Sequence, residues 1–272
     1  KFLQEMKMTF SINTNATAMA ALRTLSLTQT SLAQTQRQVE TGLKVAEPKD
    51  NPASFTIAQT MRGDIGALDA IEEGLTFGQA TVSMANAGAL QISNILIDIN
   101  QKVTQAFNDG LDVAVLQEEV DALLAQITSV VGSSVFNGVN LIDGVSADLD
   151  VLTGLGGVTQ TIAAQDLRLA TLGLVGLDLT NPAAALAAVD GAEAVVGNVI
   201  TTLGTAANRL DSQAEFTQLL TDKLKEGLGI LVDANLAEAS AELQALQTKE
   251  QLGIQSLSIA NSRPQSILQL FQ

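Results

Sequence analysis

The fold of this chain is decided by residues 71–106, IEEGLTFGQATVSMANAGALQISNILIDINQKVTQA. Steps of alternately four and three residues from Ile71 reach ten apolar residues and one glycine, whereas the residues between them are largely polar. An apolar repeat of 3.5 residues over this length indicates a helix that buries one narrow stripe against partner helices. At about 1.5 Å per residue the helix would be roughly 50 Å long, so it needs a long partner. The predicted seam consists of Ile71, Leu75, Gly78, Val82, Ala85, Ala89, Ile92, Leu96, Ile99, Val103 and Ala106.

The partner is predicted at residues 182–232. Asn181-Pro182 is typical of a helix start, because Asn is a good N-cap and Pro suits the first helical position. The same repeat follows, with seam positions Val196, Val199, Leu203, Ala206, Leu210, Gln213, Thr217, Leu220, Leu224, Gly227 and Leu231. We therefore expect the two long helices to pack along this stripe.

Shorter elements fill the rest of the middle of the chain. Asn51-Pro52 repeats the N-cap pattern and begins the first long helix, predicted over about 52–107. A third helix is expected over 113–131, after the Asp109-Gly110 turn. Residues 141–180 have a short β-like pattern, with a hairpin predicted from 149–151 to 158–162 around the glycines of 154–157.

The two ends of the chain are predicted to be amphipathic helices, over 11–43 and 236–271, that pair with each other. The first seam has polar Gln29 and Gln36 among its apolar positions, which would weaken it. We therefore expect both ends to be largely unfolded alone and to be completed by other copies of the chain. The packing residues expected between subunits are Leu22, Leu25, Leu32, Val39, Leu43, Leu236, Leu243, Leu246, Leu257 and Ile267, and Phe271 ends the second stripe.

The predicted fold class is mainly α: a long antiparallel helical coiled coil or bundle with a small β-hairpin region in the middle. Residues 8–44 and 235–272 would form a terminal-helix domain, and residues 45–234 a rod domain. Residues 1–7 are expected to be a leader or an expression remnant, with Met8 as the natural start.

Composition excludes several classes of function. The chain has no His, Cys, Trp or Tyr, so a catalytic triad, a thiolate or histidine metal site and a disulfide are excluded, and we expect no cofactor. The net charge of −15 is concentrated in residues 45–234, at −17, against +3 and −1 for the two ends. Such a surface disfavours nucleic acid as a partner. Without a run of about 18 apolar residues, no membrane insertion is expected.

Several motifs run in order along nearly the whole chain: SINTN at 11–15, ETGLKVA and KDNPA at 40–46 and 49–53, VFNGVNL at 135–141, LGTAANRL at 203–210 and ANSRPQSILQL at 260–270. Together they resemble the motifs of bacterial flagellins. The VFNGVNL stretch is similar to the family's FNGVKLL stretch, and the last motif to its ANQxPQ ending. Only about 40 residues separate Leu141 from Thr180, so the variable outer domains of many flagellins are expected to be missing.

The resemblance implies a structural subunit that self-assembles into the extracellular flagellar filament, for swimming. It also implies export through the flagellar secretion channel without a cleaved signal peptide. The implied partners are further copies, other flagellins, the filament cap, the hook-junction protein and an export chaperone. The alternatives are a hook–filament junction protein, a secreted flagellin-like adhesin or binding protein, and a hydrolase using paired carboxylates such as Asp148 and Asp150.

The resemblance also bears on detection by a host. Flagellins sensed by the vertebrate toll-like flagellin receptor carry a stretch similar to LQRVRELAVQ, and the matching stretch here is LIDINQKVTQ, residues 96–105. Asp98 and Asn100 stand at the two arginine positions, and Lys102 replaces a leucine. Glu119 matches a further glutamate that the receptor uses. Because Asp reverses the charge of an interface Arg, we expect this chain to escape the receptor. Asp98 and Lys102 could also simply be an ion pair one turn apart.

Overall fold

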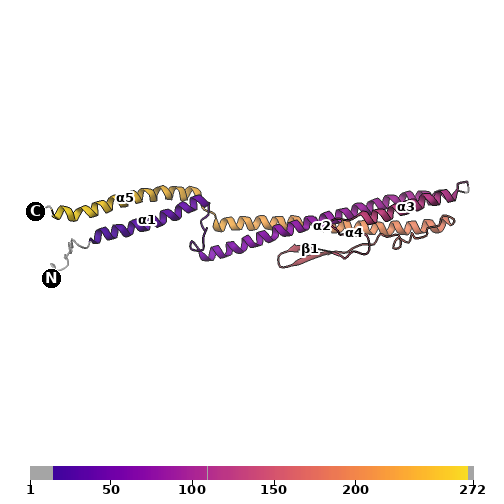
Figure 1. Cartoon of the computed structure of the whole chain (residues 1–272), viewed down its shortest axis with the longest axis horizontal. Coiled ribbons are helices and arrows are strands. Elements are labelled where there is room, and N and C mark those ends of the chain that lie inside the picture. Colours follow the sequence, from indigo (N-terminus) through magenta and orange to yellow (C-terminus); the bar gives the residue numbers. More distant parts are fainter. Residues whose placement is uncertain (1–14, 109, 269–272) are drawn as a thin grey trace. The chain divides into compact units, whose positions relative to one another are not determined.

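The computed structural model describes residues 15–108 and 110–268, with side chains described through residue 262. Among them, the elements follow in the order α1 (Ala16–Thr41), α2 (Pro52–Gln105), α3 (Val113–Ser133), β1 (Leu149–Gly154), β2 (Val158–Ile162), α4 (Pro182–Val232) and α5 (Leu236–Leu268), as labelled in Figure 1. The predicted mainly helical fold with one small hairpin is confirmed. The chain forms two compact units: unit 1 comprises residues 1–62 and 225–272, and unit 2 residues 63–224. These boundaries lie inside α2 and α4, whereas the sequence analysis placed the division near residues 45 and 234.

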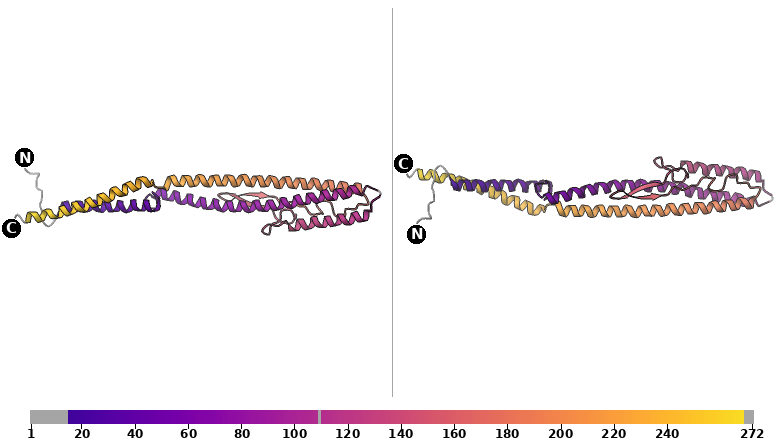
Figure 2. Two further views of the ribbon diagram at one scale, coloured as in Figure 1. Left: turned by 90° about the horizontal axis from the view of Figure 1, so that it is seen from above. Right: turned by 90° about the horizontal axis from the view of Figure 1, so that it is seen from below.

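The core of unit 2 is the stripe predicted on α2. All eleven predicted positions are buried, and Leu75, Ile92 and Leu96 have no exposed surface. On α4, the seam is buried from Val196 to Leu210, while Leu220 and Leu224 are partly buried against the same core. α3 runs beside the last part of α2 in both views of Figure 2, and its buried residues, such as Ile127, join this core. The predicted pairing of long helices is therefore present in unit 2.

The β1–β2 hairpin explains the single glycine in the seam. The two strands form the predicted hairpin; they are antiparallel, with Leu149 opposite Ile162. The buried side chain of Val151 faces α2 closely, because a Cβ on Gly78 would lie 2.8 Å from a Val151 methyl group. The amide of Gln213 on α4 donates to the Thr153 carbonyl at 2.8 Å. The hairpin is thus held against both long helices.

The two predicted Asn-Pro helix starts are confirmed. The side chain of Asn51 accepts the backbone N–H of Ser54 at 3.1 Å, and Asn181 accepts that of Ala184 at 3.3 Å. In each case the following proline is the first helical residue. Each side chain satisfies an N–H that the first turn of a helix leaves without an intrahelical partner.

Unit 1 contains an antiparallel pair of helices, α1 and α5. The Asn15 amide donates to the Ala260 carbonyl at 2.7 Å, and the Gln29 amide to the Glu250 carboxylate at 3.1 Å. The two end helices therefore pair with each other, as predicted. That they are largely unfolded before assembly stays a prediction. Residues 11–14 of the first predicted helix and Phe271 of the last lie outside the described residues, as does the side chain of Ile267.

The seam of α1 differs from the predicted one at alternate positions. The half-buried or buried residues that face α5 are Ala18, Ala21, Leu25, Thr28, Leu32, Thr35 and Val39. Leu22, Gln29 and Gln36 were predicted on this stripe but are exposed, and Leu236 of α5 is exposed as well. Small side chains at the alternate positions let α5 approach closely: a Cβ on Gly253 would lie 3.2 Å from a Leu25 methyl group. At three turns of α1 the smaller of two consecutive residues, Ala21, Thr28 or Thr35, therefore faces α5, because the helices lie close together.

α4 is the one helix among the described residues that is long and apolar enough to cross a membrane, with a mean hydropathy of 1.5 in its most apolar window. The sequence analysis found no such span. Length and composition are weak evidence for a membrane span, because the core helix of a folded domain passes the same test. Ala185, Val189 and Ala192 of that helix are buried in the core of unit 2.

Candidate assembly surface

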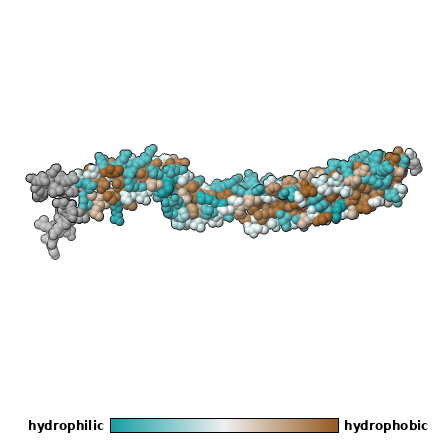
Figure 3. All heavy atoms as spheres, viewed as in Figure 1, coloured by the Kyte–Doolittle hydropathy of each residue, from teal (hydrophilic) through white to brown (hydrophobic). Residues whose placement is uncertain are grey.

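The α1–α5 pair leaves many large apolar side chains exposed. On α1, Leu22 is 58% exposed, and on α5 Ile254 is 54% exposed. Figure 3 shows hydrophobic patches among the hydrophilic residues on the visible face of this pair. Exposed apolar patches of this kind are typical of interaction sites. The exposed large apolar residues of the pair are Met19, Leu22, Leu27, Leu236, Leu252, Ile254 and Ile259.

The threonines of α1 add little polarity to this surface. The hydroxyls of Thr24, Thr28 and Thr30 each donate to the carbonyl oxygen four residues earlier, at 3.0–3.1 Å. This bond satisfies the hydroxyl within its own helix and leaves the methyl group to pack. The sequence contains eight phenylalanines and no other aromatic residue, so this surface depends on aliphatic groups.

The connection from α1 to α2 is fixed by backbone hydrogen bonds. Gly42 ends α1 in the left-handed conformation, with φ +71°, as a C-terminal glycine often does. The N–H of Lys44 donates to the Val232 carbonyl at 2.7 Å, and that of Ala234 to the Gly42 carbonyl at 2.9 Å. The Asp50 carboxylate accepts the N–H groups of Ala46 and Glu47. Val45, Ala58 and Val232 form the small core beside it, and Leu43 packs against them.

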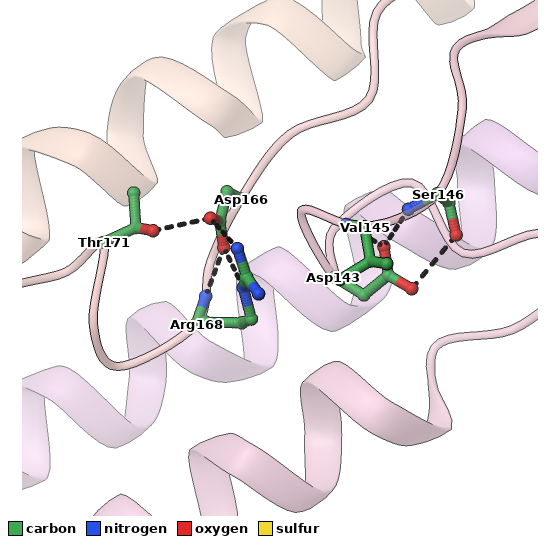
Figure 4. Close-up of polar contacts among 6 residues, drawn as sticks. All are labelled: Asp143, Val145, Ser146, Asp166, Arg168 and Thr171. Atoms are coloured by element: carbon green, nitrogen blue, oxygen red, sulfur yellow. Dashed lines mark hydrogen bonds and ion pairs between the residues drawn. The ribbon is translucent and has the colours of Figure 1, made fainter.

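A second fixed segment lies in unit 2, between α3 and α4 (Figure 4). The Asp166 carboxylate accepts hydrogen bonds from the Arg168 guanidinium at 2.7 and 2.9 Å and from the Thr171 hydroxyl at 2.6 Å. These bonds, led by that of Arg168, hold the pKa of Asp166 well below its ordinary value. Asp143 accepts the N–H groups of Val145 and Ser146. Desolvation is the largest single effect on the pKa of Asp143 and raises it, but the hydrogen bonds from these residues together outweigh it, so this pKa is also lowered. Both carboxylates therefore serve as acceptors that hold turns in place.

Gln117 of α3 binds this segment, a role that the sequence analysis did not single out. Its amide nitrogen donates to the Leu177 carbonyl at 2.8 Å, and its amide oxygen accepts the Leu179 N–H at 2.9 Å. A primary amide can bond to an extended backbone as a neighbouring β-strand would, because it offers one donor and one acceptor side by side. No local pattern in the sequence marks a glutamine for this role, since Leu177 and Leu179 lie 60 and 62 residues away.

The residues of the predicted receptor region lie on different faces of α2. Asp98 is exposed, whereas the Asn100 amide donates to the Glu193 carboxylate of α4 at 3.2 Å. The ammonium of Lys102 pairs with Glu119 of α3. Lys102 is thus bound to the next helix, and the expected ion pair with Asp98 is not the one that forms.

The carboxylates that the sequence analysis weighed as catalytic also have structural contacts. Asp148 accepts the Ala164 N–H at 2.8 Å, and Asp150 accepts the Thr161 hydroxyl across the hairpin at 2.5 Å. Within residues 15–108 and 110–262, no cluster of three or more acidic side chains is placed to hold a metal ion.

Comparison with known proteins agrees with this arrangement. The model of the bacterial flagellin N-terminal helical region matches residues 12–147, and that of the C-terminal helical region matches residues 186–271. Flagellin FljM of Caulobacter vibrioides is 38% identical over 269 residues, covering 96% of this chain and 98% of its own. The chain belongs to the bacterial flagellin family.

Other flagellins are similar over the same length. The flagellin of Brucella melitensis is 34% identical and covers 96% of this chain and 99% of its own. A crystal structure of Bacillus cereus flagellin aligns with a TM-score of 0.49 and 24% identity, over 53% of this chain and 88% of that one. This flagellin is accordingly a structural subunit of the extracellular flagellar filament, in a short form without outer domains.

Proposed function

We propose that this flagellin polymerises chiefly through α1 and α5. The observation that supports this is the set of exposed aliphatic side chains on both helices. Covering them with another protein surface lowers the free energy, because it removes apolar area from water. The predicted packing residues Leu22, Leu25 and Leu32 divide into two groups. Leu25 and Leu32 belong to the seam within the chain, whereas Leu22 is free to meet another subunit.

Charge separates the roles of the two units. Unit 1 has ten basic and nine acidic residues, for +1, whereas unit 2 has four basic and twenty acidic residues, for −16. Copies of unit 1 can therefore pack closely without repulsion, while unit 2 repels its copies and favours contact with water. Polymerisation should be faster at about 0.5 M salt than at low ionic strength, because salt screens that repulsion. A rate that falls with salt would show that attractive ion pairs dominate instead.

Electron microscopy of the purified protein, after addition of ammonium sulfate as a seed, tests the proposal. The chain should form long filaments alone, which a hook–filament junction protein would not do. The variant Met19→Asp/Ile259→Asp should lose assembly, because it places charge on exposed apolar positions of α1 and α5. The control Val175→Asp changes a side chain that is 71% exposed in unit 2 and should still assemble. Assembly by the first variant would contradict the proposal.

Family membership supports a proposal for the export route. We infer that the chain passes through the flagellar secretion channel without a cleaved signal, with a chaperone before export and the cap and junction protein at the filament ends. N-terminal sequencing of filaments from a culture should show the Ser11–Asn15 segment intact, and a mature end beyond it would contradict this. A non-enzymatic role agrees with membership of a family of structural proteins. A ligand that raises the Tm of the monomer would instead favour the adhesin alternative.

We further propose that the surface around Asp98 does not engage the toll-like flagellin receptor. The Lys102–Glu119 ion pair supports this, because it occupies the glutamate that matches the receptor-binding one. The purified monomer should give little signal in a cell reporter assay, and Asp98→Arg alone should recover little. Full activation by the wild-type monomer would contradict the proposal.

A further inference from the structure

α1 and α5 border a groove of about 360 Å³ on one side of the pair. Small side chains line it: Ala21, Thr24 and Thr28 from α1, and Gly253 and Ser256, beside Leu252, from α5. The hydroxyls of Thr24 and Thr28 are already bonded within α1, so the groove offers mainly apolar contact. Its depth depends on Gly253, where a Cβ would approach a Leu25 methyl group to 3.2 Å.

The opposite side of the same pair carries a ridge. A helix turns by about 100° per residue. Relative to the seam residues Leu25 and Gly253, the groove residues Thr24 and Leu252 are rotated in one sense, whereas Leu22 and Ile254 are rotated in the other. In an antiparallel pair, rotation in the same sense brings residues of both helices to the same side. Leu22 and Ile254, 58% and 54% exposed, therefore form a ridge opposite the groove.

The groove and the ridge lie at the same level of the pair. The Asn15–Ala260 and Gln29–Glu250 hydrogen bonds fix which residues are opposite each other. By that register, Leu22 lies across from the region of Ile254, and Thr24 lies across from the region of Leu252. Two copies placed side by side at one height would thus bring the ridge of one to the groove of the next.

We propose that the Leu22–Ile254 ridge of one subunit packs into the Thr24–Leu252 groove of a second copy of this chain. The inference rests on the proposed role of α1 and α5 and names the contact that they make. Because the two patches differ, the contact is heterologous, and it can repeat without limit as a filament requires. Charge permits it, since unit 1 is nearly neutral and Lys249 is the one charged residue among the described residues that line the groove.

Crosslinking between engineered cysteines tests the contact, because the chain has no cysteine of its own. The double variant Leu22→Cys/Ser256→Cys is polymerised and treated with a short bis-maleimide reagent. The expected result is loss of the monomer band and a ladder of multimers on a denaturing gel. The same protein kept unpolymerised, and filaments of either single variant, should remain monomeric.

Two outcomes would overturn the inference. Filaments of the double variant that form normally but yield no multimers would show that ridge and groove do not meet. Dimers from Leu22→Cys alone would show a symmetric contact between two ridges. If the first pair prevents assembly, Thr24→Cys/Ile254→Cys joins the same surfaces and must give the ladder. Failure of the wild-type chain to polymerise would instead refute the proposed function itself.

Discussion

Units 1 and 2 are both built on antiparallel helices, yet they distribute their apolar side chains differently. In unit 2, three helices, the hairpin and the 163–179 segment bury one continuous core, in which Leu96, Ile99 and Leu203 have no exposed surface. In unit 1, Leu25, Leu32 and Val39 of the α1–α5 pair stay only half-buried. A helix pair surrounds few side chains fully, whereas a third layer surrounds many more. Unit 2 therefore buries its core within one chain, whereas under the proposed function neighbouring copies cover the exposed side chains of unit 1.

Removal of residues 236–272 should have the largest effect on this contrast. The shortened chain loses all of α5, so α1 has no partner and assembly should be abolished. Unit 2 should remain folded, because among the described residues its core contains none from α5. Electron microscopy and circular dichroism on heating measure the two effects. Unfolding of the remaining chain at room temperature would show that unit 2 depends on unit 1.

A matched pair of leucine substitutions compares the two helix seams. Leu96→Ala removes a fully buried side chain from unit 2 and should cost about 3 kcal/mol of unfolding free energy. Leu32→Ala, at a half-buried position of α1, should cost the monomer about 1 kcal/mol or less. Urea unfolding of both monomers gives the two values. Equal losses would mean that the α1–α5 seam is as well packed as the core of unit 2.

Glycine substitutions test how rigid the fixed segment between α3 and α4 is. Gly144→Ala should cost roughly 2 kcal/mol, because φ is +65° and the new Cβ would clash with the Asp166 carboxylate. Gly138→Ala is the control: its φ is +83°, but no described atom lies within 4 Å of the added group. The difference in Tm between the two variants isolates the contact with Asp166. Equal Tm values would show that the segment moves away freely.

The smallest expected effect is a pH dependence of the stability that this segment contributes. Since the pKa of Asp166 is lowered in the folded chain, its contribution to stability is complete above the unfolded value of about 3.9. The contribution is lost as the pH falls below that value. Asp166→Asn should therefore lower the urea midpoint at pH 7 more than at pH 3, whereas Asp190→Asn, exposed on α4, should not. The same decrease at both pH values would assign the effect to lost packing rather than charge.

Local sequence determined the elements on which the fold rests. Every position that the 3.5-residue repeat of α2 predicted from Ile71 to Ala106 is buried, because that helix is strongly apolar on one face and meets partners along this length. Asn51 and Asn181 marked two helix starts, since capping depends only on neighbouring residues. The hairpin followed from its alternation and its glycines, and the family from motifs spread along the chain.

Tertiary structure decided what depended on partners far along the chain. In α1, the repeat predicted Leu22, Gln29 and Gln36 on the seam beside Leu25 and Leu32. The smaller Ala21, Thr28 and Thr35 face α5 instead, because the two helices approach closely. That choice also left Leu22 exposed. Likewise, Gln117 binds Leu179 and Lys102 pairs with Glu119 of another helix, where the sequence offered Asp98 nearby. A repeat fixes which side of a helix is apolar, but only the distance to its partner fixes which residue of each turn is covered.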